Sequence, residues 1–332
     1  MRIMKLAIVF AAALALQFPL GGPSFAGQTW KLGHVCVPKA DNPYQATALK
    51  FKELLGKNAG ITVKIFPQRQ LGDDGTILSG VRNGLIQVAA ATLGPVSSYD
   101  PKVELLELPF LYKNTAHLDA VLDGPIGREL LDGLEKSGFK GLGFFDDGIN
   151  NITNSKHPIH SARDFHGLQM RTIPGQIRSA VMKSLGANPV PVPYSELYTA
   201  LQTGVVDGQS NPNWVISARS LWEVQKYVSV TQHIWGGAAL VMNLNLFNSL
   251  SPAEQKKVLA AGKKACQYGR KVGRAADANY LKVAIKHGMI VDQHPDLASM
   301  RAATAPVYNK IYKLHPDWQS TILKIKEEGK QF

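Results

Sequence analysis

The chain has 332 residues and a formal net charge of +12. With 45% hydrophobic and 19% charged residues, its composition is that of a globular protein and excludes a disordered one. The positive charge is compatible with nucleic acid, a membrane surface or small anions, but no run holds five or more Lys or Arg. We therefore interpret most basic residues as solvated surface and expect no nucleic acid partner.

The first 26 residues have the parts of a secretory signal peptide. Arg2 and Lys5 give a positive start, an apolar run of 11 residues covers 6–16, and small residues precede a cleavage site after Ala26. That run is shorter than the roughly 20 residues that cross a bilayer, and no Cys stands beside the cleavage site to carry a lipid. We therefore expect an exported, periplasmic protein.

Removal of these 26 residues from the 332 leaves 306, and the net charge falls to +10 because the leader has two basic and no acidic residues. This length predicts two lobes rather than one compact core. Two cysteines remain, Cys36 and Cys266. An oxidising compartment permits a disulfide between them, but their spacing does not require one.

The first half of the mature chain alternates between strand and helix patterns. We expect a strand over 29–35, a helix from 44 to about 55, an alternating strand over 61–66 and a buried strand over 86–91. An Asp after Gly72 can cap a further helix, which stops at Gly84. This rhythm predicts an α/β fold with a largely parallel sheet.

A similar pattern returns about 120 residues later. Ser195 is the predicted cap of a helix that Gly204 ends, and residues 205–208 are expected to re-enter a strand. The segments 81–87 and 201–207 share a helix end, a Gly and a buried strand. The match agrees with two lobes of related architecture, although any two βαβ units share these features.

The second half ends in helices. Ser251, Pro252 and Glu254 form a capping box with Pro at the first helical position, and the apolar periodicity then continues to about Lys286. So long a helix is expected to span both lobes. A final helix is predicted from 298 to about 326, with a break near Pro316.

Common catalytic signatures are absent from the sequence, including the nucleophile elbow, zinc-protease and phosphate-loop motifs. His157 and His160 flank Pro158, which forbids the helix that a metal pair would need. Asp146 and Asp147 are adjacent and precede Gly148, so we interpret them as a polar strand exit rather than paired catalytic acids. We expect no enzyme activity, no metal and no cofactor.

Arg171 is the most informative single residue. It lies within an apolar strand pattern just before Pro174 and Gly175. A buried guanidinium is costly unless an anion pairs with it. From spacing alone, a ligand anion is no better supported than an ion pair with a protein acid or a side chain that reaches water.

Several motifs in fixed order and spacing surround this arginine. They are Gly167 to Gly175, Leu185 to Pro191, Tyr194 to Gln209 and Asn211-Pro212, with Gln70 to Asp73, Glu107 to Phe110 and the start of the long helix. Together they cover nearly all of the mature chain. They resemble the solute-binding subunits of tripartite ATP-independent periplasmic (TRAP) transporters, of the DctP type.

The resemblance implies a two-lobed α/β periplasmic solute-binding protein with a hinge and a long helix spanning both lobes. We assign 27–148 plus about 238–276 to lobe I and 149–237 plus about 277–332 to lobe II. The family's function implies capture of a small organic anion by lobe closure and delivery to a TRAP membrane permease. We expect a monomer.

The resemblance also assigns ligand-binding positions. The family's selectivity arginine, which makes a two-pronged contact with a substrate carboxylate, falls on Arg171. Asn211, Tyr194 and His233 fall on pocket positions, and Trp214 and Trp235 are aromatics that shape the cleft or pack in the core. The further candidate ligand-binding residues are Asn150, Gly175 and Thr92.

This sequence departs from the family pattern at three positions. Many members have a second arginine where Asn150 stands, and Val35 and Pro95 replace pocket positions that are polar in sialic-acid binders. These differences argue against sialic acid and favour a monocarboxylate, hydroxylated or aromatic, over a dicarboxylate. The alternatives are the binding protein of an ATP-driven transporter, a periplasmic sensor and, less well supported, a periplasmic enzyme.

Overall fold

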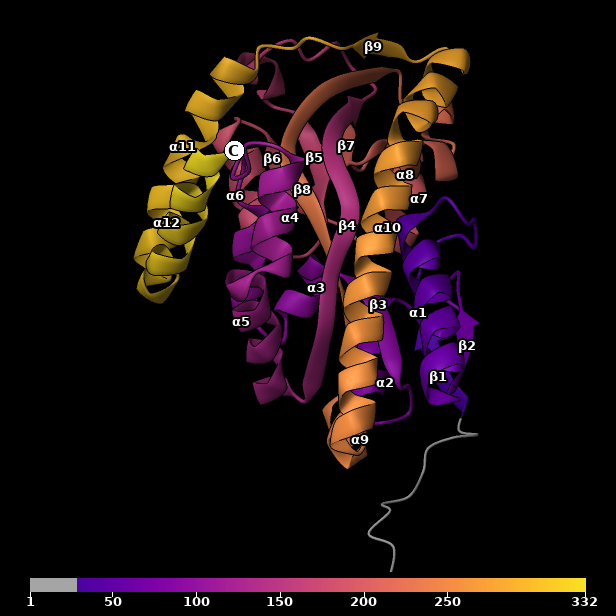
Figure 1. The fold of residues 1–332 in the computed structure, drawn as a ribbon. Helices are drawn as coiled ribbons and strands as arrows, with labels where there is room; N and C mark the ends of the chain where they lie inside the picture. Colours follow the sequence, from indigo (N-terminus) through magenta and orange to yellow (C-terminus); the bar gives the residue numbers. More distant parts are fainter. Residues whose placement is uncertain (1–28) are drawn as a thin grey trace, which may run out of the picture.

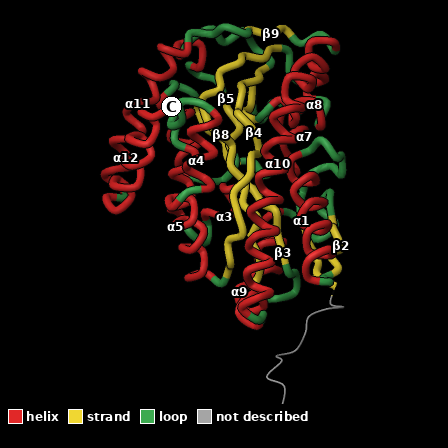
Figure 2. The backbone as a smooth tube through the Cα atoms, viewed as in Figure 1, coloured by secondary structure: helices red, strands yellow, loops and turns green. Residues whose placement is uncertain are grey.

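A computed structural model describes residues 29–332, so the predicted signal peptide lies outside the described part. One nine-stranded sheet runs through the molecule in the order β2-β1-β3-β8-β4-β7-β5-β6, with β9 paired to β8. Helices flank this sheet (Figure 1), and the coloured backbone shows the strands gathered at the centre (Figure 2). The expected α/β class is therefore confirmed.

Two long strands form the centre of the sheet. β4 (Phe139–Asn154) and β8 (Tyr227–Asn243) pair antiparallel over nearly their full length. Their register shifts three times, and the middle shift, between Asp146 and Gly148, inserts Asp147 as a bulge. The sequence prediction of a strand exit at 146–148 was wrong, because these residues lie in the middle of β4.

Parallel strands attach to the two ends of this central pair. At one end lie β1 (Thr29–Gly33), β2 (Thr62–Phe66) and β3 (Val88–Thr92), and at the other lie β5 (Gln169–Thr172), β6 (Asn188–Pro191) and β7 (Gly208–Asn211). We call these the β1–β3 half and the β5–β7 half. The lobe boundaries assigned from the sequence remain a prediction.

The predicted helices of the β1–β3 half are present. Asn42 caps α1 (Pro43–Ala59), and Asp73 accepts a 3.1 Å hydrogen bond from the Thr76 amide to cap α2 (Asp74–Arg82). The other elements of this part of the chain are α3 (Leu93–Ser97), the 3₁₀ helix η1 (Pro101–Glu107), α4 (Thr115–Asp123), α5 (Pro125–Gly133) and η2 (Leu134–Ser137).

In the β5–β7 half the predicted cap at Ser195 was wrong. Ser195 lies inside a 3₁₀ turn, η4 (Tyr194–Glu196), and α7 (Leu197–Gln202) starts without a side-chain cap. Residues 205–207 also precede the strand that they were expected to form, which begins at Gly208. The other elements are η3 (Ala162–Phe165), α6 (Gln176–Ser184), α8 (Asn213–Ala218) and η5 (Leu221–Glu223).

α10 (Pro252–Lys286) follows α9 (Leu244–Ser249) and extends beside both halves (Figure 1). Its predicted capping box is present, since the Ser251 and Glu254 side chains each bond the other's backbone N–H. Glycine permits its close packing: a Cβ at Gly269 would lie 2.0 Å from Thr47 Oγ1 of α1. Asn213 of α8 donates to Asp277 of α10 at 2.9 Å, so this helix contacts both halves.

After β9 (Ile290–Asp292), the chain ends in α11 (Leu297–Leu314), η6 (Pro316–Trp318), α12 (Gln319–Glu328) and η7 (Gly329–Gln331). The predicted break near Pro316 is confirmed. Cys36 and Cys266 are both buried and free, so the disulfide that the sequence left open does not form. No helix within residues 29–332 is both long enough and apolar enough to cross a membrane.

Candidate ligand-binding site

A cavity of about 320 Å³ lies between the two halves. The β1–β3 half lines it with residues such as Val35, Tyr44 and Thr92, and the β5–β7 half with Asn211 and Trp214. Thr92 and Asn211 are the last residues of β3 and β7. The carboxyl ends of strands in both halves therefore meet at the cavity, which is where open α/β sheets bind ligands.

Arg171 is fully buried on β5, with 0% of its surface exposed. Its Nε donates to the carbonyl oxygen of Val192 at 2.9 Å, whereas Nη1 and Nη2 have no hydrogen-bond partner among the described residues. No acid within residues 29–332 forms an ion pair with it. Burial, and then the charge of Arg178, lowers the pKa of Arg171 to about 9.

Unsatisfied buried donors on a cation are costly. Arg171 does not itself line the cavity, but Tyr194 and Asp147, which do, are among the groups whose charge acts on it. The guanidinium is bonded to Val192, whose chain neighbour Pro193 lines the cavity, and two of its nitrogens have no partner among the described residues. A ligand carboxylate would supply two oxygens in the matching fork geometry.

Four other predicted residues line the cavity: Thr92, Tyr194, Asn211 and Trp214. The Arg219 guanidinium stacks 4.2 Å from the centre of the Tyr194 ring, which fixes that aromatic wall. Asn211 Nδ2 donates to Gln209 Oε1. The apolar positions noted in the sequence, Val35 and Pro95, also face the cavity.

Four predicted residues lie away from the cavity wall. Asn150 Nδ2 donates to Ser210 Oγ at 3.1 Å, and His233 Nε2 lies 3.1 Å from the same oxygen. Trp235 donates from Nε1 to Asp146 at 2.9 Å. Gly175, with a φ of 144°, precedes α6 where a Cβ would lie 2.8 Å from Glu104 Oε1. Their roles as direct ligand contacts stay predictions.

Arg178 of α6 lines the cavity and was not singled out from the sequence. Its Nε and Nη2 donate to Glu107 Oε2 and Oε1 at 2.9 and 2.6 Å, and Glu107 also accepts from the Gly237 amide at 3.0 Å. The pair joins η1 to α6, so it ties the β1–β3 half to the β5–β7 half. No local pattern reveals it, because its partners are 71 residues apart.

Two buried acids also line the cavity. Asp147 is 5% exposed and Asp74 is 8% exposed. Burial raises the pKa of Asp147 to about 6 and that of Asp74 to about 7. Thr92 Oγ1 donates to Asp74 Oδ2 at 3.3 Å, while Asp74 Oδ1 has no partner among the described residues.

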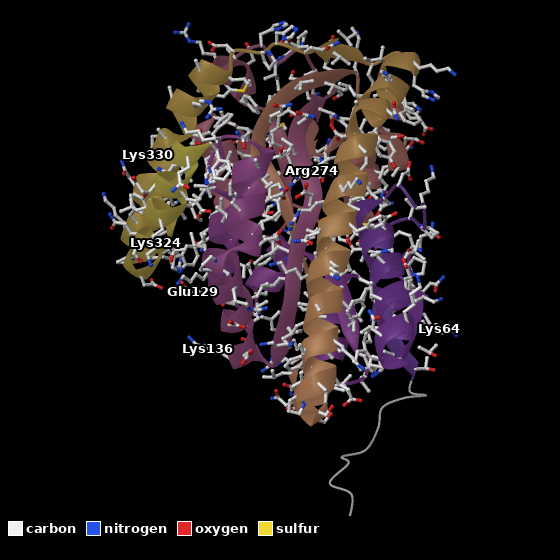
Figure 3. The ribbon with its side chains drawn as sticks, in the orientation of Figure 1. Lys64, Glu129, Lys136, Arg274, Lys324 and Lys330 are labelled. Atoms are coloured by element: carbon white, nitrogen blue, oxygen red, sulfur yellow. The ribbon has the colours of Figure 1, made fainter. Side chains whose placement is uncertain are left out.

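The neighbour of Asp147 serves a different purpose. Asp146 binds Arg274 of α10, whose Nη1 also lies 2.8 Å from Asp119 Oδ2. Figure 3 labels Arg274 where α10 passes β4. Asp146 therefore anchors the strand to α10, whereas Asp147 lines the cavity.

Arg69 brings a further cation to the cavity from the loop after β2. Both Gln68 and Arg69 have positive φ, at 50° and 63°, a conformation unusual for two successive side-chain-bearing residues. The Gln68 amide bonds the Cys36 carbonyl at 3.0 Å, which holds the loop against the cavity wall. The β1–β3 half thus contributes one exposed guanidinium and Asp74, while Asp147 comes from the central strand β4.

Residues 32–314 match the family model described as bacterial extracellular solute-binding protein, family 7 (DctP). The chain is 34% identical over 272 residues to the 2,3-diketo-L-gulonate-binding periplasmic protein YiaO of Escherichia coli, covering 81% of this chain and 82% of that protein. It is 33% identical over 306 residues to the C4-dicarboxylate-binding periplasmic protein DctP of Rhodobacter capsulatus, covering 90% of each.

Among solved structures, the fold is similar to that of a TRAP periplasmic solute-binding protein from Polaromonas sp. JS666 bound to D-erythronate. The TM-score is 0.85 at 32% identity, covering 90% of this chain and 98% of the other.

Proposed function

Since the chain belongs to the DctP family of bacterial extracellular solute-binding proteins, we propose that it captures a hydroxylated organic acid of the sugar-acid type between its two halves. Arg171 carries the proposal: its two unpartnered, buried nitrogens provide a receptor for one carboxylate. The names of two relatives, which bind 2,3-diketo-L-gulonate and D-erythronate, support a sugar acid. This choice refines the monocarboxylate that the sequence favoured.

Binding in this proposal is physical rather than chemical. A ligand that contacts both halves favours the closed arrangement by its greater affinity for it. The three register shifts between β4 and β8 supply a region where the central strands can bend. We assign the hinge to this region, and α10 restrains the bend from the outside.

A thermal-shift series with D-erythronate and related sugar acids tests the proposal. Ligand at 100 times its dissociation constant adds about 2.7 kcal/mol of stability, and each kcal/mol raises the midpoint of a chain of this size by about 2 °C or more. We expect a rise of at least about 5 °C with one or more of these acids. Unchanged midpoints across the whole panel would refute the substrate class.

Delivery to a membrane permease completes the proposal. We expect a periplasmic monomer that passes the closed complex to the TRAP permease. Mass spectrometry of a periplasmic extract should find a mature chain beginning at Gly27, and light scattering should give the mass of one chain. Ligand uptake into vesicles that hold the permease should require this protein; uptake that proceeds equally well without it would contradict the assignment.

A further inference from the structure

Two buried acids line the cavity in addition to the groups already described. Asp147 comes from the bulge in β4 and Asp74 from the first residue of α2, whereas Arg171 lies on β5. Burial and the charge of Asp147 both raise the pKa of Asp74. A ligand that occupies the cavity therefore meets carboxylates as well as cations.

These acids are not neutralised by an ion pair within residues 29–332. The cation that acts most strongly on Asp147 is Arg178, and that guanidinium already makes two hydrogen bonds to Glu107. Asp74 accepts one hydrogen bond, from Thr92, and its Oδ1 is buried without a partner. A buried carboxylate oxygen without a partner, such as Asp74 Oδ1, requires a donor. Asp147 has a hydrogen bond with Tyr44 and also lines the cavity.

We propose that Asp147, with Asp74, determines specificity by accepting hydrogen bonds from hydroxyl groups of the bound acid and by repelling a second carboxylate in the cavity. This inference rests on the proposed function, because it assumes that an organic acid occupies the cavity. It adds a criterion that separates the sugar-acid class from the dicarboxylate class, both of which occur among the relatives' names.

Three kinds of four-carbon acid would meet these carboxylates differently. The hydroxyls of D-erythronate donate to them, and hydrogen bonds to charged groups are the strong ones. The alkyl end of butanoate would remove water from the acids without replacing its hydrogen bonds. The second carboxylate of fumarate would add like-charge repulsion in a site of low dielectric constant.

Protonation of the pair changes this selectivity. The pKa values of about 6 for Asp147 and about 7 for Asp74 mean that both acids are largely charged at pH 8 and largely neutral near pH 5.5. Hydroxyl donors favour the charged form, so D-erythronate should bind more weakly at pH 5.5. Fumarate, which keeps both charges over this range, should bind more tightly at pH 5.5.

The other groups that face the pair keep their charge between pH 5.5 and 8. Arg171 has a pKa of about 9, burial raises the pKa of Cys36 and of Tyr44, and hydrogen bonds from the Thr76 backbone and side chain lower the pKa of Asp73. Arg178 and Glu107 are held as an ion pair. The opposite pH trends therefore report on Asp147 and Asp74.

Calorimetric titration of the three acids at pH 8 and 5.5 tests the inference. At pH 8 the wild type should bind D-erythronate at least about tenfold more tightly than butanoate or fumarate, the scale of a hydrogen bond to a charged group. Asp147→Asn should reduce the D-erythronate to fumarate ratio by at least about tenfold and flatten both pH trends. Asp132→Asn, which removes one exposed acid of α5, is the control and should change neither.

The outcomes separate the two proposals. Equal affinity of the wild type for all three acids, or parallel pH trends for D-erythronate and fumarate, would overturn the role of Asp147 and leave the organic-acid receptor intact. If Asp147→Asn lost affinity for all three acids by the same factor, Asp147 would have a structural role only, and its role in specificity would be overturned too. If none of the three acids binds the wild type at either pH, the proposed function itself is contradicted. The comparison of wild-type affinities at pH 8 and pH 5.5 can be made even if the Asp147→Asn variant does not fold.

Discussion

Glu107 and Arg178 form a bidentate ion pair that is buried on both sides, with 1% and 4% of their surfaces exposed. Glu107 belongs to η1 and Arg178 to α6, and a third hydrogen bond ties Glu107 to the backbone of β8. The pair therefore joins three segments around the cavity. The pair also holds α6 in place. At the start of that helix, the Gln176 and Ile177 amides donate to the Glu104 carboxylate.

Breaking this pair should be costly. Removal of one partner leaves the other charge buried and unpaired, so Arg178→Met should lower the free energy of unfolding by about 3–5 kcal/mol. Urea denaturation measures the change. Glu53→Gln, which breaks the exposed pairs with Lys50 and Lys57, should cost much less. Similar losses in the two variants would show that burial of the Glu107 pair has no such effect.

Asp74 should destabilise the empty protein at high pH. Its pKa is raised to about 7 in the folded state from about 3.9 in an unfolded chain. The folded protein therefore binds the extra proton between about pH 4 and 7, and this stabilisation is lost as the pH rises through 7.

The neutral variant Asp74→Asn avoids burial of that charge. Its stability relative to the wild type should therefore increase between pH 5 and pH 8, by about 1 kcal/mol or more. Denaturation of both proteins at the two pH values measures this. A stability difference that does not depend on pH would mean that the Asp74 carboxyl titrates normally.

Both cysteines should be reduced. Cys36 and Cys266 are 3% and 1% exposed, and burial raises the pKa of each thiol, so they should react slowly in the folded protein. Under denaturing conditions without reductant, a thiol assay should detect two groups per chain. Detection of none would reveal a disulfide and an incorrect arrangement of these segments.

The sequence predicted those elements whose signals are local. The capping box at Ser251 and Glu254 defined the start of α10, and the apolar periodicity carried the helix to Lys286 as observed. The cap at Ser195 failed because Pro193 accepts the Glu196 amide in a 3₁₀ turn instead. A serine near a helix start favours a cap only where the backbone before it is extended.

The candidate site was only partly predictable. Arg171 was identified because a guanidinium in an apolar strand is conspicuous, and the resemblance supplied Asn211 and Tyr194. Glu107 and Arg178 were missed because their pairing depends on the fold. Asp147 was taken for part of a polar strand exit because the adjacent Gly148 suggests a turn, whereas it lies within β4 and lines the cavity.

Replacement of Arg171 by lysine should weaken ligand binding without unfolding the protein. Lysine keeps the charge but lacks the two-pronged donor geometry, so Arg171→Lys should lower the affinity for D-erythronate by at least about tenfold. Calorimetric titration measures the affinity, and an unchanged circular dichroism spectrum checks the fold. Arg163→Lys, at an exposed position, should bind like the wild type. Wild-type affinity in Arg171→Lys would exclude a two-pronged contact.

A crystal structure of the complex with D-erythronate, or with the tightest acid from the thermal-shift panel, examines the carboxylate receptor itself. We predict that the two carboxylate oxygens lie within hydrogen-bond distance of Nη1 and Nη2 of Arg171, which have no partner in the described structure. A ligand whose carboxylate is bound elsewhere, with both nitrogens paired to protein groups, would contradict this account.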